Sequence, residues 1–415
     1  MEEKFIKILN KKDCTGCRAC EQICPVKAIS MKEDDEGFIT PKVDEERCIK
    51  CGLCKKTCGQ IDRFYNKNNV EERKFLGVRP KEKEIAKNST SGGIAYLISK
   101  MVIEENGIVF GSAYDENLMP YQKYVTDKKE LQQLRGSKYV TSDTKKTFSQ
   151  VKEFLEEGKK ILYIGVPCQI GGLKKFLKKD YENLYTIDII CHGVPSQKIF
   201  KKYLENEEKK LGEKIFSYNI RSKNKVDWGM GFCAEIKTKN KTKYKKADFD
   251  PYYTAFLKGK IYRECCYECK YGNLDRVGDI TLGDLWGIEQ FDYDFYDKNG
   301  VSLAVINTIK GEKIFNKVKN LVEYRQYNEQ QVTKFNGNLK HPTTRPPNRD
   351  IIYKQLDEMS FEEYSKKYFK LIWKNKLLNK DIVNNLLKFW KKKILTKSFP
   401  FSAVSFDKTN QHPFF

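Results

Sequence analysis

Eight cysteines within the first 58 residues form two copies of one spacing, and this repeat constrains the fold more than any other feature of the chain. Each copy reads Cys-x-x-Cys-x-x-Cys-x-x-x-Cys. The copies are Cys14, Cys17, Cys20 and Cys24, followed by Cys48, Cys51, Cys54 and Cys58. A tight turn through three such thiolates aims their sulfurs at neighbouring atoms of one metal cluster, whereas structural zinc uses two cysteine pairs at a longer separation.

The spacing matches that of bacterial ferredoxins, in which the fourth cysteine of each run ligates the other of two [4Fe-4S] clusters. The first cysteine group is therefore expected to be Cys14, Cys17, Cys20 and Cys58. The second is expected to be Cys48, Cys51, Cys54 and Cys24. Pro25 follows the first run as in ferredoxins, but Gly59 stands where the second run would usually be followed by proline. That departure concerns the loop and leaves the ligands unchanged.

Residues 28–31 and 38–43 are expected to form two short strands joined by a hairpin turn at residues 34–37. A disulfide framework would instead need an oxidising compartment. The chain starts Met1-Glu2-Glu3-Lys4 and shows no apolar stretch long enough for a signal peptide, so we expect a cytoplasmic protein. The sequence thus predicts an α+β, ferredoxin-like 2[4Fe-4S] domain at residues 1–66.

A ferredoxin needs about 60 residues, so most of the 415 residues must form something else. We expect one large domain at residues 67–350 and a basic helical extension at residues 351–415. The polar residues 59–73 are interpreted as a linker. Hydrophobic residues make up 40% of the chain, and no apolar run approaches the roughly 18 residues of a membrane span.

The large domain is expected to begin with a strand, a helix and a strand at residues 75–78, 94–103 and 108–114. Ser91, Gly92 and Gly93 directly precede that helix. A glycine pair there lets backbone N–H groups approach an anion, which predicts a phosphate or flavin contact. Small residues also begin helices for capping reasons alone.

Two strand-loop-helix units follow, with strands expected at residues 161–164 and 185–190 and helices extending to residues 177 and about 204. Alternating strands and helices favour a parallel sheet, in which ligands bind outside the carboxyl ends of the strands. Cys168 and Cys191 each follow one of these strands, so we expect the two thiols at one rim. The alternative is that they are two unrelated buried cysteines.

A Cys-x-x-Cys pair at Cys266 and Cys269 precedes a further strand and turn at residues 279–287. With the two rim thiols it provides four ligands for a third [4Fe-4S] cluster. This third cysteine group is Cys168, Cys191, Cys266 and Cys269. Cys265 could replace Cys266 by proximity, but only Cys266 has the two-residue spacing to Cys269. Cys233 and Cys265 are then left over from the 14 cysteines.

Several motifs together resemble the family of coenzyme F420 hydrogenase/dehydrogenase beta subunits over residues 70–350. They are Ser91-Gly92-Gly93, Arg135-Gly136-Ser137-Lys138-Tyr139, Gly165-Val166-Pro167-Cys168-Gln169, Cys191-His192-Gly193-Val194-Pro195, the Cys266 and Cys269 pair, and residues 279–287. The resemblance implies an α/β domain that binds FAD and holds its own [4Fe-4S] cluster on the third cysteine group. The flavin contacts it implies are Ser91, Gly92, Gly93, Arg135, Gly136, Ser137, Lys138 and His192. Archaeal hydrogenase members of the family lack the His192 to Pro195 motif, so the substrate stays open.

These cofactors predict an iron-sulfur flavoprotein oxidoreductase, because a flavin exchanges electron pairs whereas each cluster passes one electron at a time. The expected route joins three [4Fe-4S] clusters, FAD and a small organic substrate such as coenzyme F420, with a ferredoxin or dehydrogenase subunit as redox partner. The alternative is a non-enzymatic electron-transfer subunit that serves a partner reductase or dehydrogenase. No catalytic residue is assigned. The sequence shows no Ser-His-Asp triad, carboxylate pair or P-loop that would indicate another chemistry, and it has only 3 histidines.

The formal net charge of +22 would fall to roughly +16 with three clusters, since each four-thiolate [4Fe-4S]²⁺ cluster carries about −2. Nucleic acid is not expected as a partner, because the basic residues are spread along the chain and no nucleic-acid module is recognisable. Residues 369–397 combine many lysines with leucine, isoleucine and tryptophan. Such a helix can contact an anionic membrane surface, or it packs its apolar face on its own protein.

Overall fold

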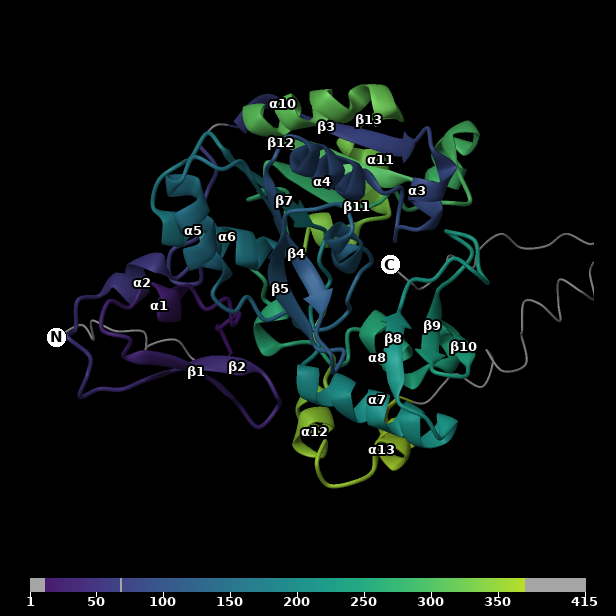
Figure 1. Cartoon of the computed structure of the whole chain (residues 1–415). Helices are drawn as coiled ribbons and strands as arrows, with labels where there is room; N and C mark the ends of the chain where they lie inside the picture. The colour runs from purple at the N-terminus through teal and green to yellow at the C-terminus, as the bar shows by residue number, and fades with distance from the viewer. Residues whose placement is uncertain (1–11, 68, 370–415) are drawn as a thin grey trace, which may run out of the picture.

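The computed structural model describes residues 12–67 and 69–369. Its centre is a sheet of eight strands in the order β13-β3-β12-β11-β7-β6-β4-β5 (Figure 1). The strands are β3 (Asn69–Pro80), β4 (Ile108–Tyr114), β5 (Pro120–Val125), β6 (Ile161–Gly165), β7 (Leu184–Ile189), β11 (Ile280–Asp284), β12 (Ser302–Thr308) and β13 (Val322–Tyr327). Strands β4, β6, β7 and β11 run parallel, whereas β5, β12, β3 and β13 pair antiparallel.

Helices cover both faces of this sheet, which explains why its central strands are continuous apolar runs. On one face, α4 (Ile94–Glu104) and α10 (Ile309–Val318) share a core with residues such as Val109 and Leu162. On the other face, α5 (Thr147–Glu156) and α6 (Pro167–Leu177) pack against the alternate residues of the same strands, such as Phe110 and Tyr163.

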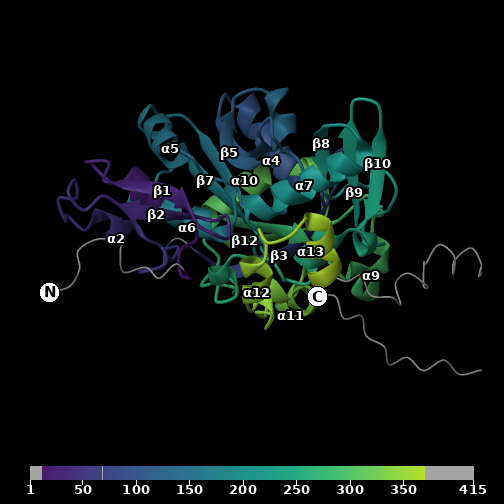
Figure 2. The same ribbon diagram turned by 90° about the horizontal axis from the view of Figure 1, so that it is seen from below.

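A separate antiparallel sheet, β10-β9-β8, lies on the opposite side of the molecule from the N-terminal strands in both views (Figures 1 and 2). Its strands are β8 (Ile215–Asn219), β9 (Cys233–Thr238) and β10 (Thr242–Lys246). It shares an aromatic-rich core with α7 (Gln197–Leu211), α8 (Pro251–Leu257), α12 (Arg349–Lys354) and α13 (Phe361–Tyr368). Residues 352–369, at the start of the expected C-terminal extension, therefore belong to a packed core.

The N-terminal region contains the predicted hairpin, with β1 (Ile29–Glu33) antiparallel to β2 (Ile39–Val43). Two short helices carry cysteines, α1 (Ala19–Gln22) and α2 (Leu53–Thr57). This region is tied to the large domain by side-chain contacts: both Arg349 Nη atoms donate to Glu36 at 2.6 Å, Arg18 pairs with Asp143, and Thr144 Oγ1 donates to the Cys17 carbonyl at 2.9 Å.

The remaining elements are short. The helices are α3 (Lys83–Lys87), α9 (Ile288–Phe291) and α11 (Glu329–Lys334). The 3-10 turns are η2 (Glu130–Leu134), η3 (Ala247–Phe249), η4 (Glu264–Cys266), η5 (Tyr293–Phe295), η6 (Lys319–Leu321) and η7 (Gly337–Leu339). None of the helices in the part of the chain that the structure describes is long and apolar enough to cross a membrane.

The mixed α/β architecture is confirmed, and the expected elements fall within a few residues of their predicted positions, with three differences. The expected linker at residues 59–73 is too long, because β3 already begins at Asn69, which pairs with Thr308 of β12. The sheet is mixed rather than parallel, and α7 extends to Leu211. The basic helix expected from residue 369 onward lies almost entirely outside the described residues.

Candidate iron-sulfur site

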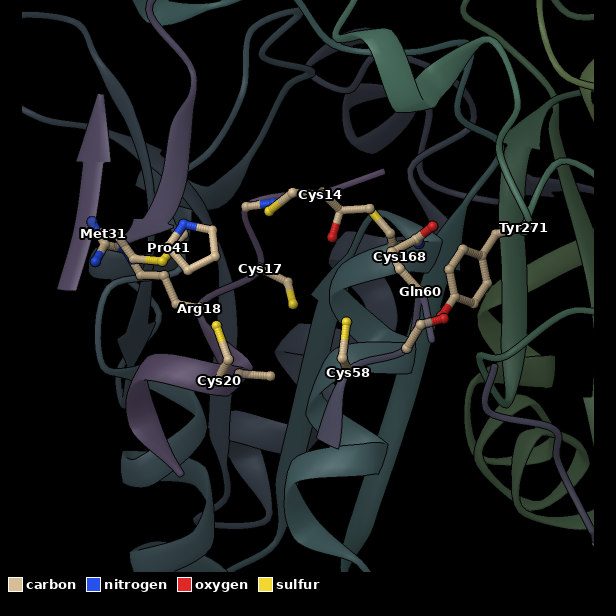
Figure 3. Close-up of a pocket in the computed structure, with 14 residues that line it drawn as sticks. Cys14, Cys17, Arg18, Cys20, Met31, Pro41, Cys58, Gln60, Cys168 and Tyr271 are labelled. Carbon is tan, nitrogen blue, oxygen red and sulfur yellow. The ribbon is translucent and has the colours of Figure 1, made fainter. Parts of the chain in front are cut away.

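The first cysteine group lines a single pocket between the N-terminal region and helix α6 (Figure 3). Figure 3 shows the sulfurs of Cys17, Cys20 and Cys58 pointing into a common space. Cys58 is the C-cap of α2 and so joins the first run from the far end of the second, as expected for a crossed pair of clusters. Gly16, with φ of +70°, makes the tight turn that brings its N–H to the Cys14 sulfur at 3.3 Å.

The thiols of this group are in an environment that disfavours free thiolates. Burial, with smaller contributions from the nearby Cys58 and Cys14 thiols, raises the pKa of Cys17 to about 12. Burial and the neighbouring thiols also raise the pKa of Cys20 and Cys58. Iron ions supply the positive charge that lets such closely packed sulfurs ionise, so the donor set fits a [4Fe-4S] cluster.

The second cysteine group lies nearer the surface. Cys54 is buried beside Ile29, and Cys24 packs against the same small core. Cys51 is exposed, and the neighbouring Ile49 is 61% exposed. The second cysteine group is therefore more accessible to solvent than the first, which faces the large domain.

Two members of the third cysteine group lie at the carboxyl ends of β6 and β7, where Cys168 is the second residue of α6 and Cys191 follows β7. Burial raises the pKa of Cys168, and the nearby Cys269 and Cys191 thiols also raise it. The structure thus brings Cys168 and Cys191 together at one rim. Cys168 also lines the pocket of the first cysteine group, so the first and third groups are adjacent.

The adjacent thiols Cys265 and Cys266 both lie at this site. Cys265 is buried, its Sγ donates to the Cys14 carbonyl at 3.3 Å, and its thiol is near enough to Cys168 and Cys191 to raise the pKa of both. Cys266 hydrogen-bonds Cys265 and packs against the aromatic core. Cys265 therefore lies close to the third group, although the Cys-x-x-Cys spacing does not include it. Cys233 lies away from these thiols, in β9.

A buried ion pair that the sequence did not reveal fixes the loop that carries Cys269. Asp188, in β7, accepts hydrogen bonds from Arg276 Nη2 at 2.7 Å and from the Gly278 N–H at 2.7 Å. Arg276 Nη1 donates to the Tyr271 carbonyl at 3.0 Å, two residues after Cys269. Arg276 also partly offsets the burial that raises the pKa of Cys191. The pair holds this loop against β7, next to Cys191.

Glycines allow the first cysteine group and α6 to approach without side chains between them. A Cβ at Gly172 would lie 2.9 Å from Cys17 Sγ. A Cβ at Gly171 or at Gly59 would lie 2.6 Å from Tyr271 Oη, which donates to the Gly59 carbonyl at 3.1 Å. Proline at position 59 would therefore collide with Tyr271. This explains the departure from the ferredoxin pattern.

The two loops expected to contact a flavin lie side by side. The Ser137 N–H donates to Thr90 Oγ1 at 2.9 Å, and Arg135 donates to Ser89 Oγ at 3.1 Å. Lys138 Nζ donates to the Ser112 carbonyl at 2.7 Å and to the Arg135 carbonyl at 2.9 Å, and burial lowers its pKa to about 7. The structure thus joins these loops, with Lys138 bound to backbone carbonyls.

The other residues expected to contact a flavin lie in the same two loops or at the edge of the sheet where the parallel strands end. The Gly92 N–H donates to Ser302 Oγ at 2.9 Å, and Ser91 Oγ donates to the Val301 carbonyl. Gly93, with φ of +84°, begins α4, and Gly136 has φ of +80°. His192 follows Cys191 at the carboxyl end of β7, and the residue is exposed.

A polar network beside His192 was missed from the sequence. Arg221 donates to Tyr139 Oη at 2.8 Å and to both Asp284 oxygens at 3.2 Å. Trp228 Nε1 donates to Asp284 at 2.6 Å. Asp284 ends β11 within the recognised 279–287 segment, but Arg221 belongs to no motif that could have indicated its role.

Two stretches of the chain match known families. Residues 13–60 match the 4Fe-4S dicluster domain, and residues 158–330 match the family described as the C terminus of the coenzyme F420 hydrogenase/dehydrogenase beta subunit. These matches confirm the resemblance found in the sequence and the binding of 4Fe-4S clusters.

Individual relatives extend the match over most of the chain. The F subunit of F(420)H(2) dehydrogenase of Methanosarcina mazei is 23% identical over 338 residues, which cover 78% of this chain and 87% of that protein. Coenzyme F420-dependent sulfite reductase of Methanocaldococcus jannaschii is 24% identical over 78% of this chain but only 48% of that protein. A chain of the F420-reducing [NiFe] hydrogenase complex from Methanosarcina barkeri superimposes with a TM-score of 0.43 and 18% identity, over 73% of this chain and 94% of that one.

Replacing Gly172 by alanine tests the close packing of α6 on the first cysteine group. The added methyl would lie 2.9 Å from Cys17 Sγ, so we expect the variant to lose about four irons per chain after anaerobic reconstitution, as measured by iron analysis. Gly337→Ala is the matched control, because its Cβ would meet His341 at an ordinary 3.6 Å. Equal iron contents in the two variants would contradict the packing described.

Proposed function

Because this chain joins a 4Fe-4S dicluster domain to a domain of the coenzyme F420 hydrogenase/dehydrogenase beta-subunit type, we propose that it is an iron-sulfur flavoprotein that exchanges electrons between ferredoxin-type clusters and FAD. The chain is an oxidoreductase-type subunit related to that family. The observation that carries the proposal is that Cys168 lines the same pocket as the first cysteine group.

The arrangement of the three cysteine groups supports a relay. The second group is nearest the surface at the exposed Cys51, the first lies between it and α6, and the third lies at the rim of the large sheet. In this proposal Cys168, Cys191, Cys266 and Cys269 hold a third [4Fe-4S] cluster. Electrons from a redox partner then reach the large domain through a short succession of thiolate-bound sites, or leave by the same path.

The carboxyl ends of the parallel strands are the proposed position of FAD, as is usual for ligands of such sheets. FAD supplies the step between single electrons and electron pairs. The residues proposed to hold it are those of the joined 89–93 and 135–138 loops, together with His192. The ring of His192, which is exposed beside Cys191, is proposed to offer a hydrogen bond to the flavin.

The proposed substrate is a small organic molecule that accepts or donates two electrons. Coenzyme F420 appears in the names of two relatives and is therefore the first candidate. The relative from Methanosarcina mazei is one subunit of a dehydrogenase, which favours the second candidate function: an electron-transfer subunit whose partner holds the substrate site. Flavin bleaching by reduced coenzyme F420, in the purified chain under anaerobic conditions, would support the first; bleaching only by reduced ferredoxin would support the second.

Replacing Cys168 by alanine tests the third cluster. We expect the variant to lose about four irons, since one of four thiolates is removed, while the ferredoxin-type EPR signals persist. Electron flow from reduced ferredoxin to the flavin should fall sharply, whereas direct chemical reduction of the flavin continues. Cys233→Ala is the matched control, because that thiol is buried in β9 away from the site. Full iron in Cys168→Ala would remove this cluster from the proposal.

The same iron analysis assigns the fourth ligand of the third group. Loss of iron in Cys266→Ala, with iron retained in Cys265→Ala, is the expected result because of the Cys-x-x-Cys spacing. The reverse pattern would transfer the role to Cys265, whose thiol is buried against the Cys14 carbonyl.

Replacing Lys138 by glutamate tests the flavin position. Its ammonium group holds the 135–138 loop through the Ser112 and Arg135 carbonyls, so a carboxylate there would repel those oxygens and displace the loop. We expect FAD content, measured by absorbance after anaerobic purification, to fall at least severalfold while the ferredoxin-type clusters remain. Lys146→Glu makes the same charge change at an exposed position and should keep its flavin. Unchanged FAD in Lys138→Glu would move the flavin site elsewhere.

A further inference from the structure

Arg263 belongs to the large domain but extends its side chain into the first cysteine run. Its backbone N–H donates to the Val194 carbonyl at 2.9 Å, which fixes its position beside the loop that follows Cys191. The residue is only 3% exposed. Cys265 and Cys266 follow closely in the chain, so one guanidinium lies between the first and third cysteine groups.

Two of its three nitrogens bind backbone carbonyls of the ferredoxin-like region. Arg263 Nε donates to the Cys14 carbonyl at 2.5 Å, and Nη2 donates to the Ile39 carbonyl at 2.7 Å. The guanidinium carbon also lies 5.1 Å from the centre of the Phe38 ring. The plane and direction of the guanidinium are therefore fixed by contacts within the ferredoxin-like region.

The remaining nitrogen, Nη1, is buried and has no nitrogen or oxygen partner within residues 12–67 and 69–369, and the guanidinium interacts with the Cys14 thiol. It lies against Gly16, where a Cβ would approach it to 2.7 Å, so the glycine leaves space for this nitrogen inside the cysteine turn. A buried cation with an unused donor is unfavourable unless an anion lies beside it. The anion available at this place is the thiolate set of the first cysteine group.

The charges around Arg263 support this assignment. Burial lowers the pKa of the guanidinium, but Cys14, Cys265 and Cys266 raise it, with a smaller contribution from Asp34. Conversely, burial raises the pKa of the Cys14 thiol, and Arg263 is the strongest of the groups that lower it.

We propose that Arg263 raises the reduction potential of the cluster on the first cysteine group. One-electron reduction takes a four-thiolate [4Fe-4S]²⁺ cluster from a charge of about −2 to about −3, and a fixed neighbouring cation stabilises the more negative form. The electron comes from the redox partner or, in a titration, from dithionite. The cation belongs to the large domain. The reduction potential of this ferredoxin-type cluster therefore depends on the contact between the ferredoxin-like region and the large domain. This inference rests on the proposed function, since it requires a cluster at the first group.

The test is an EPR-monitored redox titration of the full chain with Arg263→Met, Arg263→Gln and Arg263→Lys. In the two neutral variants we expect the midpoint of one cluster signal to fall, with reduction disfavoured about tenfold, which is about 59 mV for a one-electron couple. Arg263→Lys keeps the charge and should retain a midpoint closer to that of the unmodified protein. Arg325→Met removes an equal charge from the exposed surface of β13 and should leave all midpoints unchanged.

The outcomes separate this inference from the proposed function. Unmodified protein that binds no cluster at the first group would overturn both. Full iron with unchanged midpoints in the neutral variants would overturn only the role of Arg263, as would equal midpoints in Arg263→Lys and Arg263→Met. Loss of the same four irons from both neutral variants would also overturn it, because the side chain would then hold the cluster in place rather than tune its potential.

Discussion

The direct packing of helix α6 against the first cysteine run is the contact on which the rest of the site depends. It requires Gly171 and Gly172 on the helix, because a methyl group at either position would collide with Tyr271 or Cys17. It places Cys168, at the first turn of that helix, in the pocket lined by the first cysteine group. Electron transfer between cofactors weakens steeply with distance, so removing side chains from this boundary serves the proposed relay directly.

Buried arginines accompany the buried thiols. Arg263 lies between the first and third cysteine groups, and Arg276 is paired with Asp188 below Cys191. Some of the basic residues of this chain therefore act inside the protein, beside the cysteine groups, and not only on its surface. The thiolates and clusters concentrate negative charge in a medium of low polarity, and fixed guanidinium groups offset part of it without closing the path between them.

The sequence predicted those features that depend on local spacing or on strand direction. The ferredoxin hairpin and its cysteine runs are short-range patterns, and Cys168 and Cys191 meet because parallel strands share one carboxyl edge. Pairings between distant segments could not be predicted. Neither Arg221 with Asp284 nor Arg263 with Cys14 leaves a periodic signal, and the antiparallel return of β12 and β3 depends on tertiary pairing. Gly59 likewise depends on a distant segment, because Tyr271 packs against it.

The central claim is that one chain combines two ferredoxin-type clusters with a third cluster and a flavin. The most direct measurement is the iron, zinc and FAD content of the anaerobically reconstituted full chain. We expect about twelve irons and about one FAD per chain, from three four-thiolate groups and one flavin domain. About eight irons with full flavin would contradict the third cluster, and zinc in place of iron would contradict the central claim as a whole.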